Sequence, residues 1–201
     1  MAIISYLYLL LYRIQNGCST ICNTRKYHGL LVIPVPNLDD ENHVLLSSLD
    51  ETVIQHGAEF NLGLHKYQGN NFSPNGHKYI REFDCEHIPA TTYRVGGVIL
   101  RKEKIFVHHE NRILIRYTLL DAHSATTLRF RPFLAFRSVR EYTHENAQAS
   151  REYQLVENGI RTCIVRSATS ASNVCFSLRG DISEVPAENT ILSPFFISTS
   201  K

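Results

Sequence analysis

The chain has 201 residues, of which 43% are hydrophobic and 20% charged, and its formal net charge is +2 at pH 7. This composition is that of an ordinary globular protein with one sizeable core, and an all-β domain of this length need not be divided. The small net charge and the even spread of arginine and lysine argue against nucleic acid as a partner.

The first twelve residues are apolar, but they carry no basic segment and no small-residue cleavage site, and they are too few to span a bilayer. We therefore expect a buried first strand here and no membrane partner. The five cysteines form no CxxC pair, which indicates reduced thiols in a cytoplasmic protein. A zinc site from Cys18, Cys22 and His28 has poor spacing and no evident fourth ligand, so we expect no metal and no cofactor.

Residues 23 to 29, with the sequence NTRKYHG, form a polar segment that precedes an apolar run of strand type. Planar hydrogen-bond donors and acceptors, together with aromatic ring faces, are the groups that bind neutral sugars. A solvated turn with local hydrogen bonds is the alternative. The candidate substrate-binding residues are Arg25, Lys26, Tyr27 and His28.

Apolar side chains recur at every second residue along most of the remaining chain, which is the period of strands with one buried face. A strand ending near Pro34 comes first, and a second strand follows, interrupted at Asp50 and Glu51. Gly96 and Gly97 indicate a bulge or a tight bend. Further strands are expected at 79–83, 92–95, 98–107, 113–120, 128–136, 153–156, 160–165, 174–178 and 191–197.

These strands leave only residues 138–152 as a helical or irregular polar stretch, and Asn158-Gly159 is a hairpin turn signal. About a dozen strands without regular alternation of strand and helix exclude a doubly wound α/β fold. The sequence therefore predicts an all-β fold, a large antiparallel two-sheet β-sandwich.

The adjacent carboxylates Asp50 and Glu51 suggest acid and base catalysis, but their spacing argues against it. Successive strand residues point to opposite faces, whereas the two carboxylates of a glycosidase must flank one glycosidic bond. Two interpretations stay open: one carboxylate orients an arginine such as Arg25, or the pair lies at a solvated hairpin tip.

Residues 56–78 are rich in histidine, glycine and asparagine, which predicts a long surface excursion of the kind that often carries binding sites. Its histidines, His56, His65 and His77, lack metal-ligand spacing. We expect each to be a hydrogen-bonding surface residue.

The segment NTRKYHGLL at 23–31 resembles the signature near the start of glycogen debranching enzymes of the amylo-α-1,6-glucosidase type. Four further blocks follow in the order of that family: HVLLSSLDET at 43–52, HKYQG at 65–69, TYRVGG at 92–97 and LRFRPFLAFR at 128–137. The resemblance implies a β-sandwich of the supersandwich, galactose-mutarotase-like type. In this family the sandwich precedes a catalytic (α/α)₆ barrel, which carries the acid and base that hydrolyse the α-1,6 branch.

The resemblance implies that residues 1–201 are a single non-catalytic N-terminal domain of an enzyme of glycogen breakdown, inactive alone. Its expected partners are the catalytic barrel and, in the full-length enzyme, an α-glucan chain bordered by residues 23–29, which we call the basic segment. The chain departs from the family at its start, where a Glu-Trp pair and a glycine-rich turn are usual and no Trp occurs here.

Three other functions stay open from the sequence. A free-standing carbohydrate-binding module would use Phe72, Tyr67 and Tyr93 as an aromatic platform. A structural β-domain would self-associate into a homo-oligomer through an exposed apolar patch. A sugar epimerase needs a histidine and a glutamate facing one another, and residues 108–110 (HHE) are too crowded on one strand for that.

Overall fold

A computed structural model of the chain describes residues 29–35, 38–39, 41–67, 69, 71–142, 153–156, 159–167, 170–178 and 191–200, with side chains as far as residue 155. The predicted first strand, the cysteine pair of the possible zinc site and the basic residues 25 to 28 lie outside these ranges. So does most of the predicted irregular stretch, from residue 143 to residue 152.

The smaller main sheet is built around one long strand, β2 (Asn42–Gln55). The strands β1 (Leu31–Pro34), β3 (Ala58–Asn61) and β10 (Thr127–Ser138) all pair with it in antiparallel fashion. β2 runs without a break through Asp50 and Glu51, which pair with Arg131 and Phe130 of β10. The predicted interruption is therefore wrong, because the ladder to β10 holds both carboxylate residues in strand geometry.

The larger sheet has eight strands in the order β11-β12-β13-β14-β9-β8-β7-β6. Each pairs antiparallel with its neighbours, and adjacent strands in the chain form hairpins. β14 is the exception in sequence order, because it returns from the C-terminal region to lie beside β9. Their bounds are β6 (Ile80–Asp84), β7 (Ala90–Val95), β8 (Val98–Phe106), β9 (Arg112–Ala122), β11 (Tyr153–Val156), β12 (Gly159–Ser167), β13 (Ser170–Leu178) and β14 (Ile191–Ser200).

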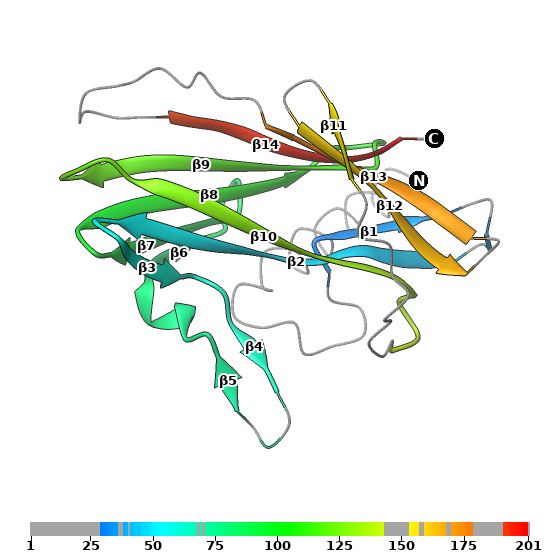
Figure 1. Ribbon diagram of the computed structural model, residues 1–201, viewed down its shortest axis with the longest axis horizontal. Coiled ribbons are helices and arrows are strands. Elements are labelled where there is room, and N and C mark those ends of the chain that lie inside the picture. The colour runs from blue at the N-terminus through cyan, green and yellow to red at the C-terminus, as the bar shows by residue number, and fades with distance from the viewer. Residues whose placement is uncertain are drawn as a thin grey trace.

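The two sheets stack face to face, with β2 and β10 in one layer and β8, β9 and β14 in the other (Figure 1). The core lies between them and draws on both, with Leu46 and Val53 from β2 facing Leu100, Ile115 and Tyr117 from β8 and β9. This arrangement confirms the predicted all-β, antiparallel two-sheet sandwich. A short 3₁₀ turn, η2 (Gly76–Tyr79), lies between β3 and β6.

Gly96 and Gly97 form the two-residue turn between β7 and β8, so the predicted tight bend is confirmed. Their φ angles are +57° and +83°. Positive φ at both central positions is typical of the type I′ turn, whose twist matches that of the flanking strands. Glycine meets this requirement at no steric cost.

The outer face of the larger sheet carries a cross-strand ion-pair ladder. Arg116 of β9 donates to Glu103 of β8 at 2.7 Å, and Arg101 lies 3.6 Å from the same carboxylate and 3.8 Å from Asp84 of β6. The hydrogen bond from Arg116 is the main reason that the pKa of Glu103 lies below its ordinary value of 4.5, although partial burial acts in the opposite direction.

This ladder predicts a pH-dependent part of the stability. A carboxyl group with a lowered pKa in the folded state contributes stability above its unfolded pKa, and that contribution is lost as the pH falls through the folded pKa. We expect the wild type to lose up to about 1 kcal/mol more than Glu103→Gln on acidification from about pH 5 to about pH 3, because the pair is partly solvated. Urea unfolding of both proteins across this pH range measures the difference. The same pH dependence of the unfolding free energy in the two proteins would contradict the prediction.

Candidate functional site

The basic segment joins the fold at a closely packed point. Leu30 donates its backbone N–H to the carbonyl of Leu46 at 2.8 Å, which ties the end of the segment to β2. A Cβ atom on Gly29 would lie 2.8 Å from Val44 Cγ1 and 2.9 Å from Val32 Cγ2, so only glycine fits here. The candidate residues Arg25, Lys26, Tyr27 and His28 precede this point and lie outside the described residues, so their sugar-binding role stays a prediction.

Two polar clusters flank β2, one on each of its faces. On the inner face, Glu51 Oε1 accepts hydrogen bonds from Lys102 Nζ of β8 and from the Tyr117 hydroxyl of β9, both at 2.5 Å. The side chains of Glu51 and Lys102 are only 3% and 10% exposed, so the ion pair lies inside the sandwich. Charge-assisted hydrogen bonds of this kind connect the two sheets across the core.

Burial and the Glu51 carboxylate together fix the protonation state of the two neighbouring phenols. Burial is the larger cause that raises the pKa of Tyr117 well above its ordinary value, and the negative charge of Glu51 adds to it. The same two causes, in the same order, raise the pKa of Tyr93. Both phenols are therefore neutral at and around neutral pH, and Tyr117 donates its hydroxyl hydrogen to Glu51.

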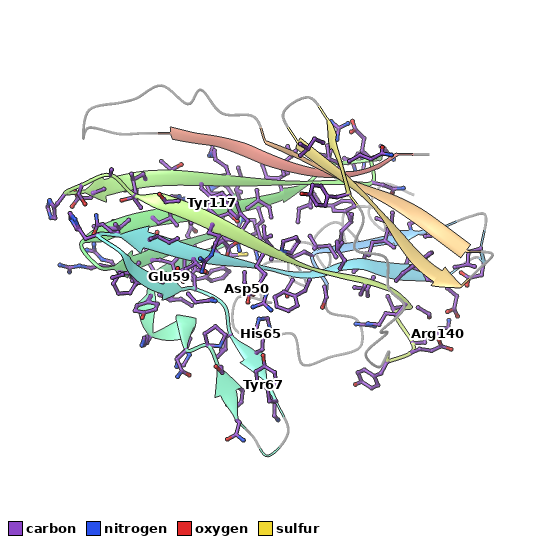
Figure 2. All side chains as sticks on the ribbon, in the orientation of Figure 1. Asp50, Glu59, His65, Tyr67, Tyr117 and Arg140 are labelled. Carbon is purple, nitrogen blue, oxygen red and sulfur yellow. The ribbon has the colours of Figure 1, made fainter. Side chains whose placement is uncertain are left out.

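On the outer face of β2, Asp50 is paired with His65 of the short strand β4 (His65–Lys66). Their side chains point toward one another below β2 (Figure 2), and His65 Nε2 lies 2.7 Å from Asp50 Oδ2. If Asp50 is a carboxylate, which only accepts, this hydrogen bond uses a proton on His65 Nε2. Gly63 closes the site, since a Cβ there would lie 2.7 Å from the Asp50 carboxyl carbon. The excursion thus covers Asp50, which is 4% exposed.

An aromatic and a guanidinium group of β10 complete this outer cluster. The His65 ring packs against Phe133 with centroids 5.1 Å apart, and the Arg131 guanidinium lies 5.1 Å from the centroid of the same Phe133 ring. Phe133 therefore packs on the imidazole from a second side, and the same ring also holds the Arg131 guanidinium. Chemically, the outer cluster is an oriented carboxylate, imidazole and arginine set at the base of the excursion.

Four of the five blocks quoted from the sequence contribute residues to these two clusters or to the phenols beside Glu51. Asp50 and Glu51 lie in one block, His65 in the second, Tyr93 in the third and Phe133 in the fourth. Lys102 and Tyr117 belong to none of them, and sequence reasoning missed both.

A signal for Lys102 is present in the sequence. It shares the inward register of β8 with Val98 and Leu100, so a charged group at that position requires a buried acidic partner. Tyr117 follows Ile113 and Ile115 at the inward-facing positions of β9. The sequence therefore indicates that Tyr117 is buried, but not that its hydroxyl has a partner.

The structure corrects three expectations about individual residues. Asp50 and Glu51 are buried on opposite sides of β2, so the hairpin-tip interpretation is wrong. Tyr93 is only 4% exposed because it faces the opposing sheet, and it cannot serve as an aromatic platform. His65 forms a hydrogen bond as expected, but Asp50 and Phe133 pack against it, so its side chain is only 19% exposed.

Four other residues of the excursion are exposed: two histidines expected at the surface and two aromatic candidates for a binding module. His56 and His77 lie at the surface, and Tyr67 and Phe72 are 57% and 45% exposed. Residues 108–110 lie in the turn between β8 and β9 and not on a strand.

Within the described ranges, no three His, Cys, Asp or Glu side chains come together as a metal site. The same part of the chain contains no helix that is long and apolar enough to cross a membrane. Cys85 is a free, exposed thiol.

Comparison with known proteins gives one finding. Residues 16–192 match the sequence model of the family described as glycogen debranching enzyme N terminal, and this span includes all five blocks and both clusters. The comparisons with curated proteins and with solved structures give no significant match.

Proposed function

This chain belongs to the family of glycogen debranching enzyme N-terminal domains, and from that premise we propose that it braces the catalytic barrel of a cytoplasmic amylo-α-1,6-glucosidase and borders its substrate cleft. The enzyme as a whole acts in glycogen and α-glucan breakdown. Hydrolysis takes place in the barrel, and the sandwich contributes binding and positioning.

The observation that carries this proposal is the engagement of both central carboxylates in structural contacts. Hydrolysis of a glycosidic bond needs an acid and a base about 6.5–9.5 Å apart across a bound sugar, or about 5–5.5 Å apart in a retaining enzyme. Asp50 and Glu51 face opposite sides of β2, and each is held by a cation or an imidazole. This arrangement supports a scaffold whose chemistry is supplied by another domain.

The position of the basic segment supports a role at the cleft. It enters the fold at Gly29, where close packing against β1 and β2 fixes its end. A segment whose last residue is anchored in this way to a sheet can present side chains to a neighbouring domain or to a substrate. Arg25 and His28 are the first candidates for contact with glucan, then Tyr27, and Lys26 is the last.

Replacement of Arg25 in the full-length enzyme tests the proposal. We expect Arg25→Ala to lower kcat/KM for branched dextrin by about tenfold or more, because a charge-assisted hydrogen bond to a substrate contributes about 1.5–3 kcal/mol. The melting temperature should stay unchanged.

Arg94→Ala is the matched control, since Arg94 is an exposed arginine on β7 within the same sandwich. It should leave both the activity and the melting temperature as in the wild type. An unchanged kcat/KM of Arg25→Ala would contradict a contact between the basic segment and the substrate.

A further inference from the structure

A small hairpin projects from the sandwich below β2 and β3, as Figure 1 shows. It consists of β4 and β5 (Phe72–Ser73), paired through His65 with Ser73 and Lys66 with Phe72. Its two aromatic rings, Tyr67 and Phe72, are 57% and 45% exposed. Rings at these positions contribute little to the core, so their presence on an arm requires another explanation.

The base of this hairpin is rigidly held. His65 is bound to Asp50 and packed on Phe133, as described above. Gly76 donates its N–H to the carbonyl of Gly63 at 2.9 Å, which closes the segment that contains the hairpin. Within the arm, Tyr67 N–H donates to the carbonyl of Asn71 at 2.7 Å. The aromatic rings are therefore presented from a fixed support, which lowers the entropy cost of binding.

The chemistry of the hairpin suits a neutral polyol. Residues 65–73, with the sequence HKYQGNNFS, contain no acid and include three residues with side-chain amides. Amides donate and accept hydrogen bonds in one plane, as sugar hydroxyls require, and the rings cover the C–H faces of the sugar. The Lys66 ammonium lies 5.9 Å from the centroid of the Phe72 ring, which leaves Tyr67 as the main stacking surface.

We propose that the β4-β5 hairpin is an accessory contact for a linear α-glucan chain, with a glucose ring stacked on Tyr67. This inference rests on the proposed function for the identity of the glucan. It adds a second contact surface, one that does not involve the basic segment.

Calorimetric titration of the 201-residue chain with maltoheptaose tests this inference. The wild type should bind with a millimolar or lower dissociation constant. Tyr67→Ala should raise this constant by about fivefold to tenfold, because the lost ring contact contributes only modestly to the binding free energy. Tyr67→Phe should retain most of the affinity. Tyr153→Ala is the matched control, because Tyr153 is 64% exposed on the distant strand β11.

Three results would overturn the inference: no binding by the wild type, equal affinity of Tyr67→Ala and the wild type, or equal losses in Tyr67→Ala and Tyr153→Ala. Equal affinity combined with a lower melting temperature of Tyr67→Ala in the full-length enzyme would assign the hairpin to the contact with the catalytic domain. The debranching rate of Arg25→Ala is a separate measurement, so failure of this inference and failure of the proposed function are distinguishable.

Discussion

Replacing Glu51 with alanine is expected to destabilise the sandwich by about 3–5 kcal/mol, because it leaves a charged lysine buried without its partner. The Lys102 side chain is 10% exposed, and its ammonium donates to the Glu51 carboxylate. The substitution also removes the acceptor of the buried Tyr117 hydroxyl. Both donors would then lie in the core without the acceptor that balances their desolvation.

A double-mutant cycle measures the interaction energy between Glu51 and Lys102 apart from the other effects of each substitution. Glu51→Ala, Lys102→Met and the double variant are compared by urea unfolding. We expect the double variant to be more stable than Glu51→Ala, because methionine removes the unpaired charge and fills a similar volume. Glu59→Ala is the control, since Glu59 forms an exposed pair with Arg129 and its loss should leave the unfolding midpoint almost unchanged. A Glu51→Ala protein as stable as this control would contradict the prediction.

The second large effect is expected at Gly76, the first residue of η2. A Cβ atom there would lie 2.1 Å from the carbonyl carbon and oxygen of Leu62 and 2.6 Å from the carbonyl oxygen of Gly63. These are backbone atoms, so no rotation of a side chain relieves the overlap. We expect Gly76→Ala to cost about 3 kcal/mol, the upper end of the usual range for overpacking.

Gly57→Ala separates this overlap from the general cost of replacing a glycine. Gly57 has a φ of +79° and no atom within 4 Å of the added Cβ, so only backbone strain of about 1 kcal/mol is expected. Urea unfolding of both variants gives the comparison. Hydrogen exchange of the Tyr67 amide should accelerate in Gly76→Ala, because the hairpin loses its closure. Equal stability of the two variants would show that the Leu62 segment moves away at low cost.

The strand pattern was predictable because it depends on neighbouring residues. On β9, Ile113, Ile115 and Tyr117 are buried while Arg112 and Arg116 are exposed, as the alternation in the sequence predicts. The Gly96-Gly97 turn was equally accessible, since positive φ at two successive positions is a local property of glycine. The all-β class and the two-sheet sandwich follow from these local signals.

The candidate site was only partly predictable. The sequence separates Asp50 and Glu51 onto opposite faces of a strand, and the structure confirms this separation. It did not reveal what each face meets: the partners found here are Lys102 and Tyr117 for Glu51, and His65 for Asp50. The possible contact of one carboxylate with Arg25 lies outside the described residues and stays a prediction. The sugar-binding role of residues 25 to 28 stays a prediction from the sequence.

The sequence by itself thus determined most of the strands, the Gly96-Gly97 turn and the family, because periodicity, turn chemistry and motif order can all be read along the chain. It did not predict β3, β4 and β5, which lie inside the expected excursion at 56–78. Only the tertiary structure decided that Glu51 bridges the two sheets and that Tyr93 is buried. The partners of Glu51 lie 51 and 66 residues away in the chain, and which residues face one another across a sandwich depends on how the two sheets stack. Alternation along one strand carries no information about that stacking.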